Sequence, residues 1–321
     1  MVGDARTVGC TMYEEGRERN IWAIGGGKGG SGKSFVTVNL GIALSERGKE
    51  VILVDADLGG ANLHNLLGIT NPSTSLDDFI RRDAVTIKDI LTETEVPNLK
   101  MVTGSIDILT MSNPKFTQKQ KVIRHISSLD ADYIILDLGA GVSYHVLDFF
   151  LISERGIFVV TPEPTSLENA YRFLRGVFFR RLSRITSKYE IKKVIESAMD
   201  RGNPEGIRTP FDLIERVEEV DRDVGMLLKE EIKRFHPQLI VNQVRNRGEA
   251  EIGFFIKSAC KKYFGIELSY LGYILYDHNV YLSIQKGRPL LLNNPTSEAA
   301  KCIRDITTQL IDGGELGWFL N

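Results

Sequence analysis

Short apolar runs alternate along this chain with longer stretches in which apolar residues recur at helical spacing. A short apolar run bounded by turn residues predicts a buried strand, and the longer spacing predicts an amphipathic helix. We therefore expect an α/β fold with a doubly wound, mainly parallel sheet and helices on both faces. The predicted strands are Ile21–Ile24, Val51–Val54, Tyr133–Leu136, Ile157–Val160, Leu239–Val241 and Leu268–Leu275.

One interval is too long for a single crossover helix. Roughly eighty residues lie between Val160 and Leu239, whereas such connections are usually much shorter. We interpret residues of about 179–236 as a helical insertion within one domain, because strand patterns are scarce there. The helices predicted in this region are Leu167–Ile185, Glu190–Asp200 and Pro210–Phe235, the last capped by Thr209. The expected organisation is an N-terminal extension (1–20), a domain (21–312) that includes the insertion, and a tail (313–321).

A glycine-rich segment follows the first predicted strand and precedes a helical pattern. Gly27–Ser34 fits the spacing G-x-x-x-x-G-K-[ST], in which main-chain N–H groups converge on phosphate oxygens. Lys33 would reach the β- and γ-phosphates, Ser34 would hold Mg²⁺, and the helix dipole would face the anion. The sheet is therefore expected to be of the P-loop NTPase type. The predicted nucleotide-binding residues are Gly27, Gly29, Gly30, Ser31, Gly32, Lys33, Ser34 and Phe35.

Carboxylates follow two other predicted strands. Asp55 and Asp57 come after Val54, and Asp137 comes after Leu136. Because an open α/β sheet binds its ligand at the carboxyl edge of its strands, these residues should lie near the glycine-rich segment. The Asp55/Asp57 pair suits contact with metal or lysine and the orientation of an attacking water, and Asp137 suits a partner of Mg²⁺. The predicted metal-site residues are Ser34, Asp55 and Asp137.

The overall charge and the cysteines narrow the classes of function. Lys and Arg number 40 against 42 Asp and Glu, so any nucleic-acid or membrane binding must come from a local patch. Cys10, Cys260 and Cys302 lie far apart, which disfavours a disulfide framework, a zinc site or an iron–sulfur scaffold. No signal peptide or apolar stretch of membrane-spanning length is seen, so we expect a cytoplasmic protein.

Lys28–Ser34 resembles the deviant Walker A motif of the MinD/ParA ATPase family, and Asp55–Leu63 resembles the first switch of that family. The similarity covers residues 20–178 and 237–312. Two further segments, Thr161–Leu167 and Leu271–Pro289, are most similar to the flagellar-number regulators FlhG and FleN within the family.

The resemblance implies an ATPase, slow and stimulated by a partner, that binds ATP and Mg²⁺ and forms an ATP-dependent homodimer. Lys28 would reach across to the phosphates of the other subunit, and Lys33 would serve its own. Asp57 would position the water, so Lys28, Lys33 and Asp57 are the predicted catalytic residues. Asn242 would lie against adenine. The expected role is a dimerisation switch that positions or regulates a flagellum, a division site or a similar structure, together with a protein partner.

Two surfaces leave alternatives open. The segment Arg172–Lys193 carries eight basic residues among phenylalanines, so a ParA-like DNA-segregation ATPase that binds DNA through it is the alternative function. The competing interpretation is a solvated helix face paired with the acidic stretch Glu215–Glu231. The pattern of Ser297–Ile311 predicts a last helix packed on the core, and the apolar tail Trp318–Leu320 leaves a peripheral membrane contact at the inner face open.

Overall fold

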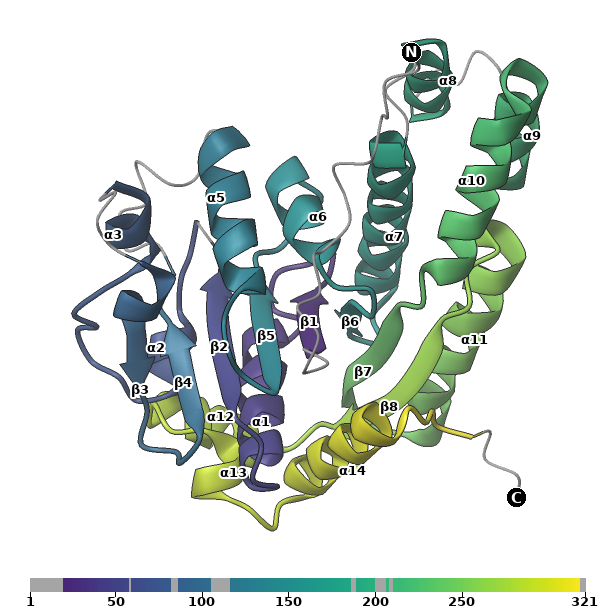
Figure 1. Ribbon diagram of the computed structural model, residues 1–321. Coiled ribbons are helices and arrows are strands. Elements are labelled where there is room, and N and C mark those ends of the chain that lie inside the picture. Colours follow the sequence, from purple (N-terminus) through teal and green to yellow (C-terminus); the bar gives the residue numbers. More distant parts are fainter. Residues whose placement is uncertain are drawn as a thin grey trace.

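The computed structural model describes residues 20–57, 59–81, 86–104, 116–185, 189–199, 206–207 and 210–317. Within these residues an eight-stranded sheet has the order β3-β4-β2-β5-β1-β6-β7-β8 (Figure 1). All neighbouring strands pair in parallel except β3 with β4. The expected fold class is confirmed. The strands are β1 (Asn20–Gly25), β2 (Val51–Ala56), β3 (Leu91–Glu93), β4 (Leu99–Val102), β5 (Tyr133–Leu138), β6 (Ile157–Val160), β7 (Gln238–Val244) and β8 (Ser269–Leu275).

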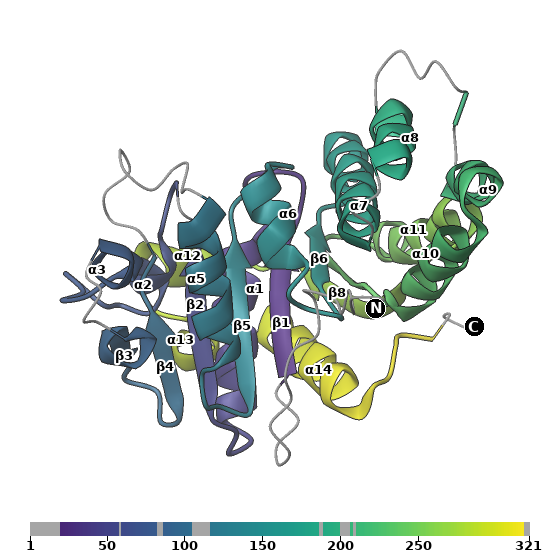
Figure 2. The ribbon, with the colours of Figure 1, turned by 45° about the horizontal axis from the view of Figure 1, so that its top comes forward.

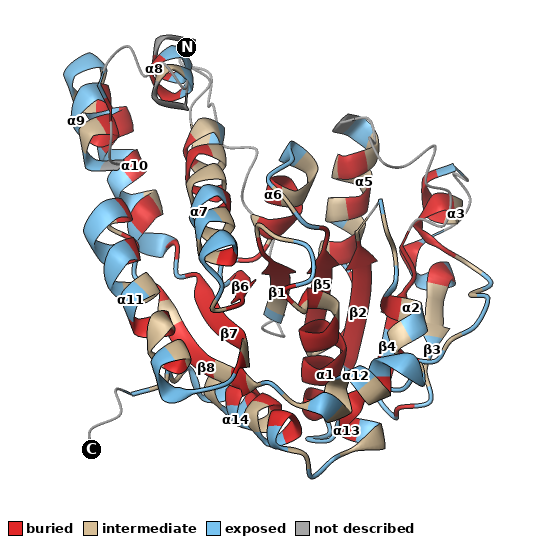
Figure 3. Cartoon of the chain, turned by 180° about the vertical axis from the view of Figure 1, so that it is seen from behind, coloured by how far each residue is buried: buried red, intermediate tan, exposed pale blue. Residues whose placement is uncertain are grey.

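Helices cover both faces of the sheet and enclose two hydrophobic cores (Figures 1 and 3). Successive side chains of a strand point to opposite faces. Accordingly Trp22 and Ile24 join the core formed with α1 and α14, whereas Ala23 joins the other. Leaving aside the long β6–β7 connection, the described helices are α1 (Lys33–Ser45), α2 (Leu63–Leu66), α3 (Leu76–Arg81), η1 (Ile87–Ile90), α5 (Phe116–Ser127), α6 (Tyr144–Phe150), α11 (Arg247–Phe264), α12 (His278–Gln285), α13 (Leu290–Asn293) and α14 (Glu298–Asp312).

The connection between β6 and β7 is helical, as the sequence predicts. It comprises α7 (Pro164–Ile185), α8 (Tyr189–Met199), α9 (Pro210–Val220) and α10 (Arg222–Arg234). These helices form an arm that stands out from the β6–β8 end of the sheet (Figures 1 and 2). Val217 and Leu228 of the arm belong to the same hydrophobic core as α5 and α6.

The prediction of one continuous helix over Pro210–Phe235 is wrong, because two helices, α9 and α10, occupy this range. Asp221 has an extended backbone (φ −155°), and its carboxylate accepts a hydrogen bond from the N–H of Val224, 3.1 Å away. This side-chain cap ends α9 and starts α10. Residues 202–205, Thr209, residues 1–19 and Trp318–Leu320, on which other expectations depend, lie outside the described residues.

The last helix, α14, packs against the core. Ser297 caps it by accepting from the N–H of Ala300, and its apolar side is buried against α1 and β8. The interpretation of this helix as a core helix is confirmed. Among the described helices, none combines the length and apolar character required to span a bilayer.

Candidate functional site

The glycine-rich segment forms a loop between β1 and α1 whose shape depends on its neighbours. Gly30 and Gly32 have φ of 78° and 92°, in the left-handed region that favours glycine. A Cβ at Gly27 would lie 2.0 Å from the carbonyl oxygen of Asn169 in α7, so only glycine fits there. The loop is therefore built against the first turns of α7.

The two lysines of the loop have different surroundings. Lys33 is 8% exposed, and its Nζ donates to the carbonyl oxygen of Lys28 at 3.3 Å. Burial lowers the pKa of Lys33, although the charges of Asp137 and Asp57 act to raise it. The Lys33 ammonium thus lies inside the loop of its own chain.

Lys28 lies on the outside of the same loop, with 36% of its side chain exposed. Its Nζ is 2.5 Å from Oε2 of Glu163 and donates to Oγ1 of Thr165 at 3.3 Å. Glu163 lies in the segment that joins β6 to α7, and Thr165 lies in the first turn of α7. Lys28 is therefore held at the rim of its own loop by Glu163 and Thr165.

Two of the strand-end carboxylates are neighbours in the sheet. Asp55 and Asp137 are opposite each other in the β2–β5 pairing. Burial raises the pKa of Asp55 to about 8, and the charge of Asp137 adds to this. Burial also raises the pKa of Asp137 to about 6, against hydrogen bonds from Ser34 and Thr37 and the charge of Lys33. Burial thus favours the neutral form of both carboxyls, and a cation bound beside them would favour the ionised form.

The predicted metal residues differ in how they are engaged. The hydroxyl of Ser34 and the carboxylate of Asp137 are hydrogen-bonded to each other, and they offer the oxygen ligands that Mg²⁺ prefers. Both oxygens of Asp55 instead accept main-chain N–H groups, from Asp57 at 3.2 Å and from Leu63 at 2.9 Å. Ser34 and Asp137 thus present oxygens of the kind that bind Mg²⁺, whereas both oxygens of Asp55 are bonded to the loop that carries Asp57.

Asp57 lies beside the loop that follows β5. Its Oδ1 accepts from the N–H of Gly59 at 3.3 Å. A Cβ at Gly139 would lie 2.8 Å from the same oxygen, so this approach requires glycine at that position. Within the described residues, no three His, Cys, Asp or Glu side chains are grouped so as to hold a metal ion.

Asn242 and Phe35 both lie next to the glycine-rich loop, and each has partners within the chain. The amide of Asn242 donates to the carbonyl oxygen of Ser31 at 2.8 Å, and its Oδ1 accepts from the N–H of Gln243. The side chain is 3% exposed and braces the phosphate loop from β7. The side chain of Phe35 is buried in the core, so only its main-chain N–H near the start of α1 is available to a phosphate.

The structure adds residues that the sequence did not single out. Glu163 and Thr165 hold Lys28, Thr37 donates to Asp137 at 3.2 Å, and Asn169 closes over Gly27. Glu163 and Thr165 lie in the Thr161–Leu167 segment. Polar residues directly after a predicted strand indicate a position at the carboxyl edge of the sheet, so the sequence could have suggested these two residues. Thr37 and Asn169 lie within helices and carried no such signal.

The basic segment Arg172–Lys193 is largely engaged within the chain. Arg181 pairs with Glu231 at 2.9 Å, as the solvated-face interpretation predicts. Arg180 and Arg184 pair instead with Asp148 of α6, a contact not foreseen. Arg172 pairs with Glu168 one turn away. The geometry therefore does not favour the DNA alternative.

Comparison with known proteins gives the family. The ParA family, described as "NUBPL iron-transfer P-loop NTPase", matches residues 17–183, just over half of the chain. The chain belongs to the MinD/ParA family of P-loop ATPases. It is 28% identical over 295 residues to the septum site-determining protein MinD of Helicobacter pylori, covering 91% of this chain and 90% of that protein.

Other relatives of this MinD/ParA chain share its fold but do not decide whether it belongs to the MinD or the FleN branch of the family. It is 26% identical over 293 residues to the antiactivator FleN of Pseudomonas aeruginosa, covering 90% of this chain and 85% of FleN. The nearly equal identities to MinD and FleN do not distinguish the flagellar branch. The structure of MinD from Pyrococcus horikoshii complexed with Mg-ADP matches with a TM-score of 0.60 at 22% identity, covering 91% and 96% of the two chains.

The raised pKa of Asp55 predicts how the stability of the metal-free protein depends on pH. The folded state holds the proton more tightly than the unfolded chain, so the free energy of unfolding should fall as pH rises from about 4 to about 8. Asp55→Asn should lower this slope. Thermal melts of both proteins between pH 5 and pH 8 measure it. Asp55→Asn also loses an acceptor for one main-chain N–H, which lowers its stability at every pH. The test is therefore the change of stability with pH, and equal slopes in the two proteins would contradict the prediction.

Proposed function

We propose that this MinD/ParA-family ATPase is an ATP-driven dimerisation switch that regulates or positions a cellular structure. Two copies would close on ATP and Mg²⁺, engage a protein partner, and reopen after slow hydrolysis. The observation that supports this most is the unlike placement of the two loop lysines. Lys33 is buried within its own loop, and Lys28 is exposed at the rim.

The roles of the residues follow from this geometry. Main-chain N–H groups of the loop and the Lys33 ammonium would bind the phosphates, and Ser34 and Asp137 would hold Mg²⁺, which neutralises charge on the phosphates. The carboxylate of Asp57 would orient the attacking water and accept its proton. Lys28 would leave Glu163 and contact the phosphates of the facing subunit, where developing charge is stabilised.

The relatives support a protein partner as the output. A complex of MinC with MinD from Aquifex aeolicus matches this chain with a TM-score of 0.59 at 20% identity, so it shares the fold. By analogy, the closed dimer of this chain would present a composite surface that the monomer lacks. The iron transfer in the family description is not proposed here. Cys260 and Cys302 are free and lie on different helices, and the described part of the chain holds no cluster of metal ligands.

Asp57→Ala tests the proposed switch. The variant should bind ATP and accumulate as a dimer, while ATP turnover falls by about 10²–10⁴-fold, the range for loss of a general base. Light scattering after gel filtration measures the dimer, and phosphate release measures turnover. Asp312→Ala, at the exposed end of α14, is the matched control. The proposal would be overturned if Asp57→Ala hydrolysed ATP at the wild-type rate and stayed monomeric both with and without ATP.

The trapped dimer also separates the DNA alternative from this proposal. We expect no ATP-dependent shift of duplex DNA by Asp57→Ala in a gel. A shift that is lost in Lys192→Glu/Lys193→Glu would favour the alternative instead. These two lysines are exposed, so the pair is a cleaner choice than Arg180 or Arg181, which hold the helices together.

A further inference from the structure

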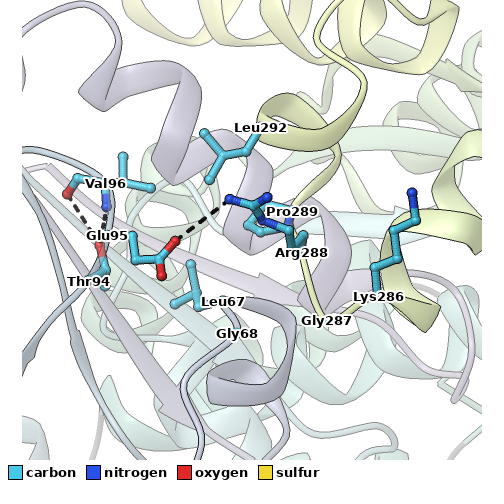
Figure 4. A pocket seen from close by; sticks show the side chains of 10 residues that line it. All are labelled: Leu67, Gly68, Thr94, Glu95, Val96, Lys286, Gly287, Arg288, Pro289 and Leu292. Atoms are coloured by element: carbon cyan, nitrogen blue, oxygen red, sulfur yellow. Dashed lines mark hydrogen bonds and ion pairs between the residues drawn. The ribbon is translucent and has the colours of Figure 1, made fainter.

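A pocket of about 190 Å³ lies apart from the phosphate loop and the strand-end carboxylates (Figure 4). It opens between the end of α2, the turn from β3 to β4, and the segment that joins α12 to α13. We call it the basic pocket, after Lys286 and Arg288 in its lining. None of the residues assigned above to nucleotide, metal or water lines it.

The chemistry of the basic pocket favours an acidic group beside an aliphatic one. Leu67, Val96 and Pro289 give it a buried apolar wall. The guanidinium of Arg288 lies 3.9 Å from the carboxylate of Glu95, with 60% and 81% of these side chains exposed. An exposed pair at that distance binds weakly. Figure 4 shows Glu95 beside Arg288, and a carboxylate from another molecule in that position would meet the same guanidinium.

Lys286 lines the end of the pocket nearest α12 and adds a second positive charge. Within the described part of the chain, its ammonium forms no ion pair. With one carboxylate against two cations, the lining carries a net positive charge. The pocket is smaller than the roughly 300–1,000 Å³ of sites that enclose a small molecule. Its size suits an anchoring side chain of a protein surface, of the kind that dominates the energy of an interface.

The base of the basic pocket is fixed by contact between two main chains. Gly68 and Gly287 have φ of 74° and 59°. A Cβ at Gly68 would lie 2.9 Å from the carbonyl oxygen of Gly287, so a side chain there would push the two walls apart. The separation of the walls is thus set by the backbone.

Both walls are attached to elements of the nucleotide site. The α2 wall begins at Leu63, whose N–H is held by Asp55, and ends one short helix later at Leu67. The opposite wall leads into α13, where the N–H of Leu291 donates to Asn39 of α1 at 3.1 Å. A change in the Asp55–Asp57 loop therefore has a short covalent path to the pocket.

We propose that the basic pocket binds an acidic side chain of a protein partner together with a neighbouring aliphatic side chain, with an affinity that depends on the bound nucleotide. The dependence on nucleotide rests on the function proposed above; the recognition of the acidic segment does not. Coupling between the two sites is reciprocal, so such a partner would also change the affinity for ATP.

A peptide library displayed on phage tests the recognition. Wild-type protein is used for selection and Lys286→Glu/Arg288→Glu for counter-selection, both free of nucleotide. We expect an enriched sequence with Asp or Glu next to Leu, Ile or Val. A synthetic peptide of that sequence should bind the double variant at least tenfold more weakly, and Glu95→Gln more tightly than wild type. The control Arg247→Glu/Lys301→Glu reverses two equally exposed charges elsewhere and should bind as wild type.

The outcomes separate the parts of the proposal. No enriched sequence, a sequence without acidic residues, or equal binding to the double variant would overturn the recognition, provided that the thermal melts of the variants match. For the coupling, the Kd of the peptide is measured with ATP and with ADP on Asp57→Ala. A difference of threefold or more supports it, and equal values overturn it. Failure to bind ATP would instead count against the proposed function and leave the nucleotide-free result intact.

Discussion

Lys28→Ala is expected to bind ATP and Mg²⁺ at close to wild-type affinity and to remain a monomer with them. Lys33, inside the loop, is unaffected by the change, whereas the contact that Lys28 would make across the dimer is lost. A hydrogen bond to a charged group contributes about 1.5–3 kcal/mol. Because a symmetric dimer loses two of them, its Kd should rise by about 10²–10⁴-fold.

The measurement is gel filtration with light scattering at several ATP concentrations, alongside fluorescence titration of an ATP analogue. Lys33→Ala is the contrasting variant, because it should lose nucleotide binding itself. Glu163→Gln removes the charge that holds Lys28 at 2.5 Å, so it should dimerise at lower ATP concentration. Dimerisation of Lys28→Ala at the wild-type ATP concentration would show that this lysine has no role across the interface.

Replacing Asp148 is expected to cause the largest loss of stability. Its carboxylate is 1% exposed and accepts hydrogen bonds from Nε and Nη2 of Arg180 at 2.7 and 3.0 Å. Lys119 of α5 and Arg184 of α7 also pair with it. Burial alone would favour the neutral acid, but these cations hold the pKa of Asp148 well below its usual range. Without the carboxylate, three cations from two helices are left facing one another.

Asp148→Asn should therefore lower the free energy of unfolding by about 3–5 kcal/mol, the range for breaking a buried ion pair from one side. Urea denaturation at pH 7 measures it. Glu168→Gln is the control, because Glu168 and Arg172 form an ion pair that is more than 60% exposed on both sides and should contribute less than about 1 kcal/mol. Since the folded-state pKa of Asp148 is depressed, its contribution should disappear as pH falls below about 4. A loss no larger than that of the control would refute this account.

The parts of the fold that were predictable depend on local pattern. The six apolar runs are strands because each is buried on both faces and contains few polar residues. β3 and β4 were missed because they have three and four residues and alternate with charged positions such as Glu93 and Lys100. The phosphate loop was recognisable because its glycines and lysines are contiguous.

The contacts that define the environment of the site join distant parts of the chain. Lys28 and Glu163 are 135 residues apart, and Arg180 and Asp148 are 32 apart. Neither pairing has a local pattern that would announce it. For the same reason Arg180 and Arg184 seemed to belong to an exposed basic face, although the fold brings Asp148 of α6 against them.

The contact between Gly27 and Asn169 gives α7 a mechanical character. This helix of 22 residues begins beside the phosphate loop and leads into α8, the next helix of the arm, at its other end. At 1.5 Å per residue it is about 33 Å long, so a tilt of about 5° at its first turn moves its last turn by about 3 Å. α7 is therefore a lever whose short end rests on the nucleotide loop. A small rotation of the first turn of α7 at the loop therefore becomes a displacement of about 3 Å at its last turn.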